Sequence, residues 1–114
     1  MEEVRPMTLK VEQGNAFTII HIQNDSVDAT SAKEIAGIKD RMNQTTIMDF
    51  GPVMFINSAG ISALLKLVIE ARKQGKKLYA VNVTAHHRKV FEMVDMLRYM
   101  PIAKMEDLMP LISA

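Results

Sequence analysis

The stretch Phe55-Ile56-Asn57-Ser58-Ala59-Gly60-Ile61 lies between an apolar segment and a segment with helical spacing. This arrangement predicts a buried strand or loop that turns sharply into a helix, with Ser58 at the helix N-terminus. A hydroxyl in that place lies beside unpaired backbone N–H groups and the positive end of the helix dipole. It either caps the helix or holds a phosphate, and the residues alone favour the cap.

The helix that follows has the clearest pattern in the chain. A broad apolar face predicts that it is mostly buried. The residues of this face are Ile61, Leu64, Leu65, Leu67, Val68 and Ile69. Arg72 and Lys73, followed by Gly75, predict its end, because cations favour the negative end of the dipole and glycine is common just past it.

Three strands are expected before this helix. Thr8–Glu12 alternates apolar and polar residues, and Ala16–Ile22 is more apolar, so the two segments predict a hairpin around Gln13-Gly14-Asn15. Thr45–Phe50 is a third strand. Its consecutive apolar residues predict that both of its faces are covered.

A helix is also expected between the hairpin and the third strand. Ser31 and Glu34 match the S-x-x-E capping box, which places the start of the helix at Ser31. Ile35, Ile38 and Met42 then form one apolar face. The preceding loop, residues 23–28, is polar and has no regular period.

Downstream, Leu78–Val83 predicts a fourth strand and Thr84 the N-cap of a helix that carries Phe91. A short fifth strand is expected near Tyr99–Ile102. A last helix is expected over Glu106–Ile112, disturbed by its proline. The order of elements predicts one α/β domain, residues 1–114, with a mixed sheet of four to five strands and helices packed against it.

The composition of the chain limits the classes of partner and the location that can be expected. The chain of 114 residues has no cysteine, no tryptophan and a net charge of +1, which gives no long-range attraction to nucleic acid or anionic lipid. Residues 1–6 have no signal-peptide pattern and no apolar run could span a bilayer, so a cytoplasmic location without a membrane is expected. The ten methionines are expected mostly in the core, with Met54 and Met93 facing outward.

The usual catalytic patterns are missing. Around Ser58 the first glycine of G-x-S-x-G is replaced by Ile56, and no phosphate-binding glycine loop occurs. The three histidines lack metal-ligand spacing, and His86 and His87 are expected on the surface. The basic run at residues 72–77 is explained by a helix C-terminus. We therefore expect no enzyme activity, no cofactor, no metal and no direct nucleic-acid partner.

Residues 46–61 resemble the signature of the STAS domain, as found in bacterial anti-sigma factor antagonists. The family pattern is an apolar strand with an Asp, a few turn residues, and an aromatic residue near D-S-[SAT]-G-[LI]. The segments 27–32, 77–84 and 88–93 resemble the family's first helix start, fourth strand and third helix. The resemblance covers nearly the whole chain and implies a STAS fold.

The resemblance also implies a function. In such systems the unphosphorylated antagonist binds an anti-sigma factor that is also a serine kinase, and phosphorylation of the antagonist ends the binding. The phosphoacceptor falls on Ser58, and the family's other functional acid falls on Asp28. The implied partner-binding residues are Asp28, Asn57, Ser58, Ala59 and Gly60. A PP2C-like phosphatase is a further implied partner, and a monomer or weak dimer is expected.

One departure from the pattern leaves alternatives open. The Asp that usually precedes the serine is Asn57 in this chain. Its neutral amide either slows phosphorylation or makes the phosphorylated form easier to hold. A scaffold or regulatory subunit without phosphorylation, and a nucleotide sensor, are the alternative functions. Because Asp28 lies in a polar loop, replacing it with Ala is expected to leave stability almost unchanged.

Overall fold

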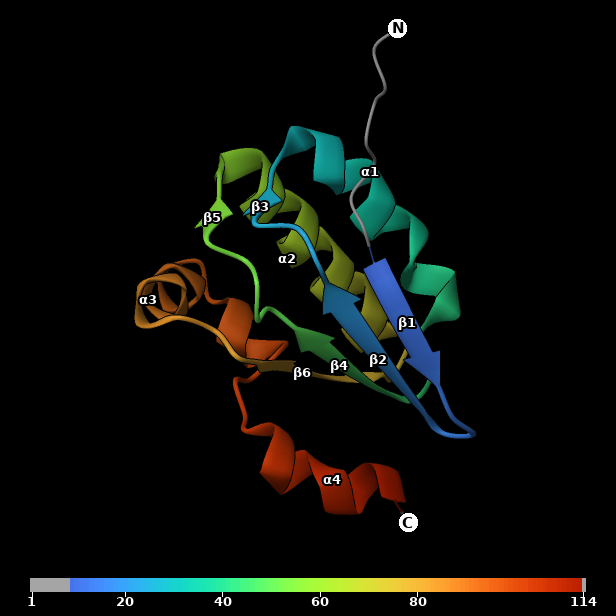
Figure 1. Cartoon of the computed structure of the whole chain (residues 1–114). Helices are drawn as coiled ribbons and strands as arrows, with labels where there is room; N and C mark the ends of the chain where they lie inside the picture. The colour runs from blue at the N-terminus through green and yellow to red at the C-terminus, as the bar shows by residue number, and fades with distance from the viewer. Residues whose placement is uncertain (1–8, 114) are drawn as a thin grey trace, which may run out of the picture.

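The computed structural model describes residues 9–113 and has a four-stranded sheet at its centre (Figure 1). The strands lie in the order β1-β2-β4-β6; the first pair is antiparallel and the other two pairs are parallel. Their bounds are Leu9–Gln13 for β1, Phe17–Ile22 for β2, Thr45–Asp49 for β4 and Lys77–Val81 for β6. The predicted mixed sheet is confirmed.

The N-terminal hairpin is also confirmed. Leu9 pairs with Ile22 and Gln13 with Thr18, and the amide of Gly14 donates to the carbonyl of Phe17 at 3.0 Å in the turn. Residues 1–8, which include the predicted first residue of β1 and the segment used to judge a signal peptide, lie outside the described residues.

Helices cover both faces of the sheet. On one face, α1 (Ala29–Gly37) and α2 (Ser58–Lys73) enclose a core that includes Met48 of β4. On the other face, Leu108 of α4 (Met105–Ser113) packs with Ile47. The consecutive apolar residues of β4 are thus covered on both sides, as predicted. No helix in residues 9–113 is long and apolar enough to cross a membrane.

The ends of α2 and α3 (Ala85–Met93) agree with the predictions. Arg72 and Lys73 occupy the last turn of α2, and Gly75 adopts the left-handed conformation with φ of 80°. The hydroxyl of Thr84 accepts from the amide of His87 at 3.1 Å and so caps α3. Phe91 of α3 is buried.

Two predictions for the C-terminal part are wrong. No fifth strand forms near residues 99–102 of the described chain: Ile102 makes only an isolated bridge with Ala80, and Pro101 has no N–H to extend a ladder. The last helix does not end at Pro110, which lies inside α4. At that position the proline removes one intrahelical hydrogen bond, and the helix continues to Ser113.

A second, two-stranded sheet was not predicted. It consists of β3 (Ser26–Val27), inside the segment expected to be an irregular loop, and β5 (Phe55–Ile56). The two strands are parallel and lie beside the starts of α1 and α2 in Figure 1. This small sheet is what brings the predicted site residues together.

Candidate functional site

The pairing of β3 with β5 joins two segments that are distant in sequence. Val27 lies opposite Ile56, and the amide of Asn57 donates to the carbonyl of Val27 at 3.1 Å. The next residue after β3 is Asp28, which begins α1, while Asn57 begins α2. The two predicted site segments therefore meet where the two helices start.

Asp28 is the N-cap of α1. Its Oδ1 accepts from the backbone amides of Thr30 at 3.0 Å and Ser31 at 3.2 Å, and the Ser31 hydroxyl accepts from the amide of Asp28 at 3.2 Å. The predicted capping box of Ser31 with Glu34 is therefore wrong by three residues. Ser31 is the third helical residue of a box whose cap is Asp28.

This cap changes the expected effect of replacing Asp28. We expect Asp28→Ala to lower the free energy of unfolding by about 0.5–2 kcal/mol, because two helix amides lose their acceptor. Urea unfolding followed by circular dichroism measures the loss. Asp25→Ala is the control: Asp25 is exposed and, within residues 9–113, its carboxylate accepts only from the Ser26 hydroxyl, so its replacement should be close to neutral. Equal losses in the two variants would refute the capping role.

The cap of α2 is Asn57 and not Ser58. The Asn57 Oδ1 accepts from the amide of Gly60 at 2.9 Å, and Ser58 is the first residue inside the helix. The interpretation of Ser58 as a cap is therefore wrong. Ser58 is exposed, and within residues 9–113 its hydroxyl takes part in no hydrogen bond. No structural role of the hydroxyl therefore explains why a serine stands at this position.

Gly60 allows the first turn of α2 to lie against β3. A Cβ on this buried glycine would be 2.3 Å from the carbonyl oxygen of Val27 and 3.0 Å from its side chain. Neighbouring Ala59 is half-buried. Gly60 therefore keeps α2 close enough to β3 for all five predicted site residues to lie together.

Beside Ser58 runs a shallow apolar groove of about 370 Å³ between the start of α2 and α3. It is lined by Ile56, Asn57, Ser58, Ile61, Ser62, Val90 and Val94. Next to these residues in the chain, Met54, Phe55 and Met93 are 65%, 63% and 84% exposed. The outward positions of Met54 and Met93 are confirmed. The exposure of Phe55 was missed, because a strand pattern says nothing about how a two-residue strand is covered.

The surroundings of Ser58 carry no negative side chain in the nearby sequence. Residues 50–69 and 82–91 contain no Asp or Glu, while Lys66, Arg88 and Lys89 are exposed. His87 is buried, contrary to the expected surface position. Burial and the charge of His86 lower the pKa of His87, so its ring is neutral at pH 7. Asp28 at the start of α1 and Glu92, which pairs with Arg88, are negative, so the site is an apolar groove with charges of both signs around it.

The sequence of the chain matches a family model. The STAS domain model covers residues 8–108. The chain belongs to the STAS domain family. No curated protein sequence matches the chain.

Solved STAS structures agree with this assignment. The unphosphorylated anti-sigma factor antagonist SpoIIAA is 19% identical, with a TM-score of 0.70 over 94% of this chain and 99% of that one. SpoIIAA of Bacillus in its phosphorylated form is 18% identical, with a TM-score of 0.68 over 92% of this chain and 99% of that one. An anti-sigma factor antagonist from Mycobacterium paratuberculosis is 14% identical, with a TM-score of 0.73 over 95% of both chains.

The same fold also occurs inside a much larger protein. The murine anion transporter Slc26a9 is 19% identical, with a TM-score of 0.60 over 72% of this chain but 14% of the transporter. At these identities the likenesses show the fold of the STAS domain and not its activity. The function must therefore be argued from the site.

Proposed function

We propose that this STAS domain is an anti-sigma factor antagonist in a partner-switching pathway. In its unphosphorylated form it binds an anti-sigma factor that is a serine kinase, and phosphorylation of Ser58 releases it. The observation that carries the proposal is the position of Ser58: it is exposed, its hydroxyl makes no hydrogen bond within residues 9–113, and it lies beside an apolar groove. Asp28, Asn57 and Ala59 complete the partner surface, and the buried Gly60 holds the first turn of α2 against β3 beneath it.

The local physics supports a switch of this kind. A phosphate on Ser58 adds about −1.5 to −2 charges at the start of α2, where the helix dipole and free backbone amides favour an anion. The cap at Asn57 is neutral, so it does not repel the phosphate. The domain therefore tolerates the modification, while a partner that buries the apolar groove meets a new charge and loses affinity.

The proposal also covers the location, the oligomeric state and a second partner of the domain. It acts as a non-enzymatic regulator in the cytoplasm, as a monomer or weak dimer. A PP2C-like phosphatase restores the form that binds the kinase. The structures of SpoIIAA in phosphorylated and unphosphorylated forms support the choice of this pathway class.

Phosphorylation at Ser58 is directly testable. Incubation with ATP and the anti-sigma factor kinase of the same organism should add one phosphate to the wild type and to Ser62→Ala, but none to Ser58→Ala. Ser62 is the matched control because it is also exposed on α2, one turn later. Intact-mass and peptide mass spectrometry give the result. Phosphate retained by Ser58→Ala would refute the site.

A scaffold without phosphorylation is the second candidate. Asn57 in place of the family's usual Asp, and the likeness to part of an anion transporter, favour it. In the same experiment, a wild-type chain that binds a partner firmly but never gains phosphate would support the scaffold. Wild-type phosphorylation that stops partner binding would exclude it.

A further inference from the structure

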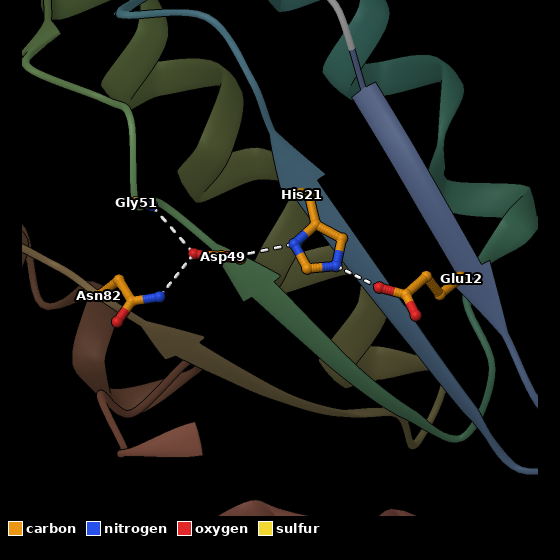
Figure 2. Close-up of polar contacts among 5 residues, drawn as sticks. All are labelled: Glu12, His21, Asp49, Gly51 and Asn82. Carbon is orange, nitrogen blue, oxygen red and sulfur yellow. Dashed lines mark hydrogen bonds and ion pairs between the residues drawn. The ribbon is translucent and has the colours of Figure 1, made fainter. Parts of the chain in front are cut away.

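A row of polar side chains crosses the sheet on the face opposite α1 and α2 (Figure 2). It takes Glu12 from β1, His21 from β2, Asp49 from β4 and Asn82 from just after β6. The His21 Nδ1 is 2.8 Å from the Asp49 Oδ2, and its Nε2 is 2.5 Å from the Glu12 Oε2. Three strands of the sheet thus give one member each, Asn82 follows the fourth, and His21 lies between two carboxylates.

The second oxygen of Asp49 holds two loops. Its Oδ1 accepts from the amide of Gly51 at 2.9 Å and from the Asn82 Nδ2 at 2.8 Å. Gly51 begins the segment that leads through β5 to Ser58. Asn82, in the left-handed conformation with φ of 60°, begins the segment that leads to α3. The first segment supplies Ile56 and Asn57 to the groove beside Ser58, and the second leads into α3, which supplies Val90.

The proton state of His21 decides how firmly the row is held. A doubly protonated imidazole donates to both carboxylates, whereas a neutral ring donates to only one. With the ring charged, each bond also joins two ions of opposite charge, whereas a neutral ring makes only a hydrogen bond to a carboxylate. Loss of the proton therefore removes one bond, weakens the other, and leaves two carboxylates without the cation between them.

The pKa shifts of His21 and Asp49 agree with this geometry. Burial lowers the pKa of His21, but the hydrogen bonds and charges of Asp49 and Glu12 outweigh it and leave the pKa above its ordinary value. Burial raises the pKa of Asp49, but hydrogen bonds from Asn82, His21 and Gly51 outweigh it and leave the pKa lowered. The His21 contribution is complete below the ordinary imidazole pKa and is lost as pH rises through the raised value. The Asp49 contribution is lost as pH falls through the lowered value.

Few other charges act on His21. Lys10 is its cross-strand partner in β1, so its ammonium is the one cation that the β1–β2 register places on the same side. From α4, Leu108 packs against this face through Ile19, Ile47 and Val81. Both ring nitrogens are engaged, and no group in residues 9–113 is arranged to hold a metal ion. The row is therefore suited to positioning and not to catalysis or metal binding.

We propose that the row Glu12–His21–Asp49–Asn82 is a proton-dependent latch, in which protonated His21 fixes Asp49, and Asp49 fixes the segment that leads to Ser58 and the segment that leads to α3. His21 and Asp49 are positioning residues. The latch itself needs no partner, whereas its effect on Ser58 rests on the proposed function.

An NMR titration tests the latch. The Gly51 amide proton and the His21 ring protons of the wild type should titrate with one midpoint, above the ordinary imidazole value. His21→Gln should remove this transition from Gly51, and His86→Gln, on the exposed start of α3, should leave it unchanged. Glu12→Gln should lower the two midpoints equally, and it keeps the test decisive if His21→Gln fails to fold. A Gly51 midpoint that does not follow His21 would overturn the latch.

A kinase assay at fixed pH tests the link to Ser58. Asp49→Asn should reduce the rate of Ser58 phosphorylation at least several-fold, while His86→Gln retains the wild-type rate. Equal rates in the wild type and Asp49→Asn would overturn the positioning role. If the wild type itself is not phosphorylated, the proposed function fails, and the titration still decides the latch.

Discussion

Gly60→Ala is expected to abolish binding of the anti-sigma factor kinase and to lower the free energy of unfolding by about 1–3 kcal/mol, as overpacking does in tight sites. The new Cβ would lie 2.3 Å from the Val27 carbonyl oxygen, and backbone atoms cannot turn away as a side chain can. The first turn of α2 must then move away from β3. That movement separates Ser58 from Asp28 and breaks the surface proposed for the partner.

Gly37→Ala is the matched control for this variant. Gly37 is the last residue of α1, and a Cβ placed on it meets no atom within 4 Å. Ala at this position should be neutral or stabilise the fold by up to about 1 kcal/mol. Urea unfolding and titration calorimetry with the kinase measure both effects. A Gly60→Ala variant that binds like Gly37→Ala would show that close contact between α2 and β3 is unnecessary.

Leu64→Ala is expected to lower the free energy of unfolding by about 2–5 kcal/mol through the cavity it leaves in the core. Leu64 is fully buried on α2, one turn after Gly60, and belongs to the core cluster that also contains Met48 of β4. A loss of this size is a large share of the stability of a small domain. Thermal and urea unfolding measure it.

The neighbouring Leu65 provides the comparison. Leu65→Ala removes the same atoms from a half-buried side chain, so its loss should be clearly smaller. Similar losses in the two variants would contradict the difference in burial between Leu64 and Leu65. A nearly neutral Leu64→Ala would contradict the buried face predicted for α2. Partner binding by Leu65→Ala, measured under conditions where it is folded, separates a loss of stability from a loss of the surface.

The elements with long apolar patterns were predicted well because each pattern lies within a single helix or strand. The period of α2 and the consecutive apolar residues of β4 need no knowledge of the rest of the fold. The helix starts were predicted less well. Asp, Ser and Asn all cap helices, so the sequence allows either Ser31 or Asp28 as the N-cap of α1. It likewise allows either Ser58 or Asn57 as the N-cap of α2. The pairing of β3 with β5 decides both cases, and no local pattern reveals it.

The polar row illustrates the same limit. Alternation places His21 on one face of its strand, and a polar Asp49 ends the next parallel strand. Only the register of the sheet sets these two residues opposite each other and brings Glu12 beside them. His21 is half-buried, and its two carboxylate partners could be found only from the three-dimensional arrangement.

The contact between β3 and β5 has a consequence for a chain that is still being synthesised. Translation delivers β3 and α1 well before β5 and α2, so a nascent chain that ends after α1 has Asp28 without its neighbour Asn57. Contacts between distant segments form only when both have emerged. The surface proposed for the kinase therefore exists only on a domain whose second half has docked. Incomplete chains and early degradation fragments would not compete with the finished protein for the kinase.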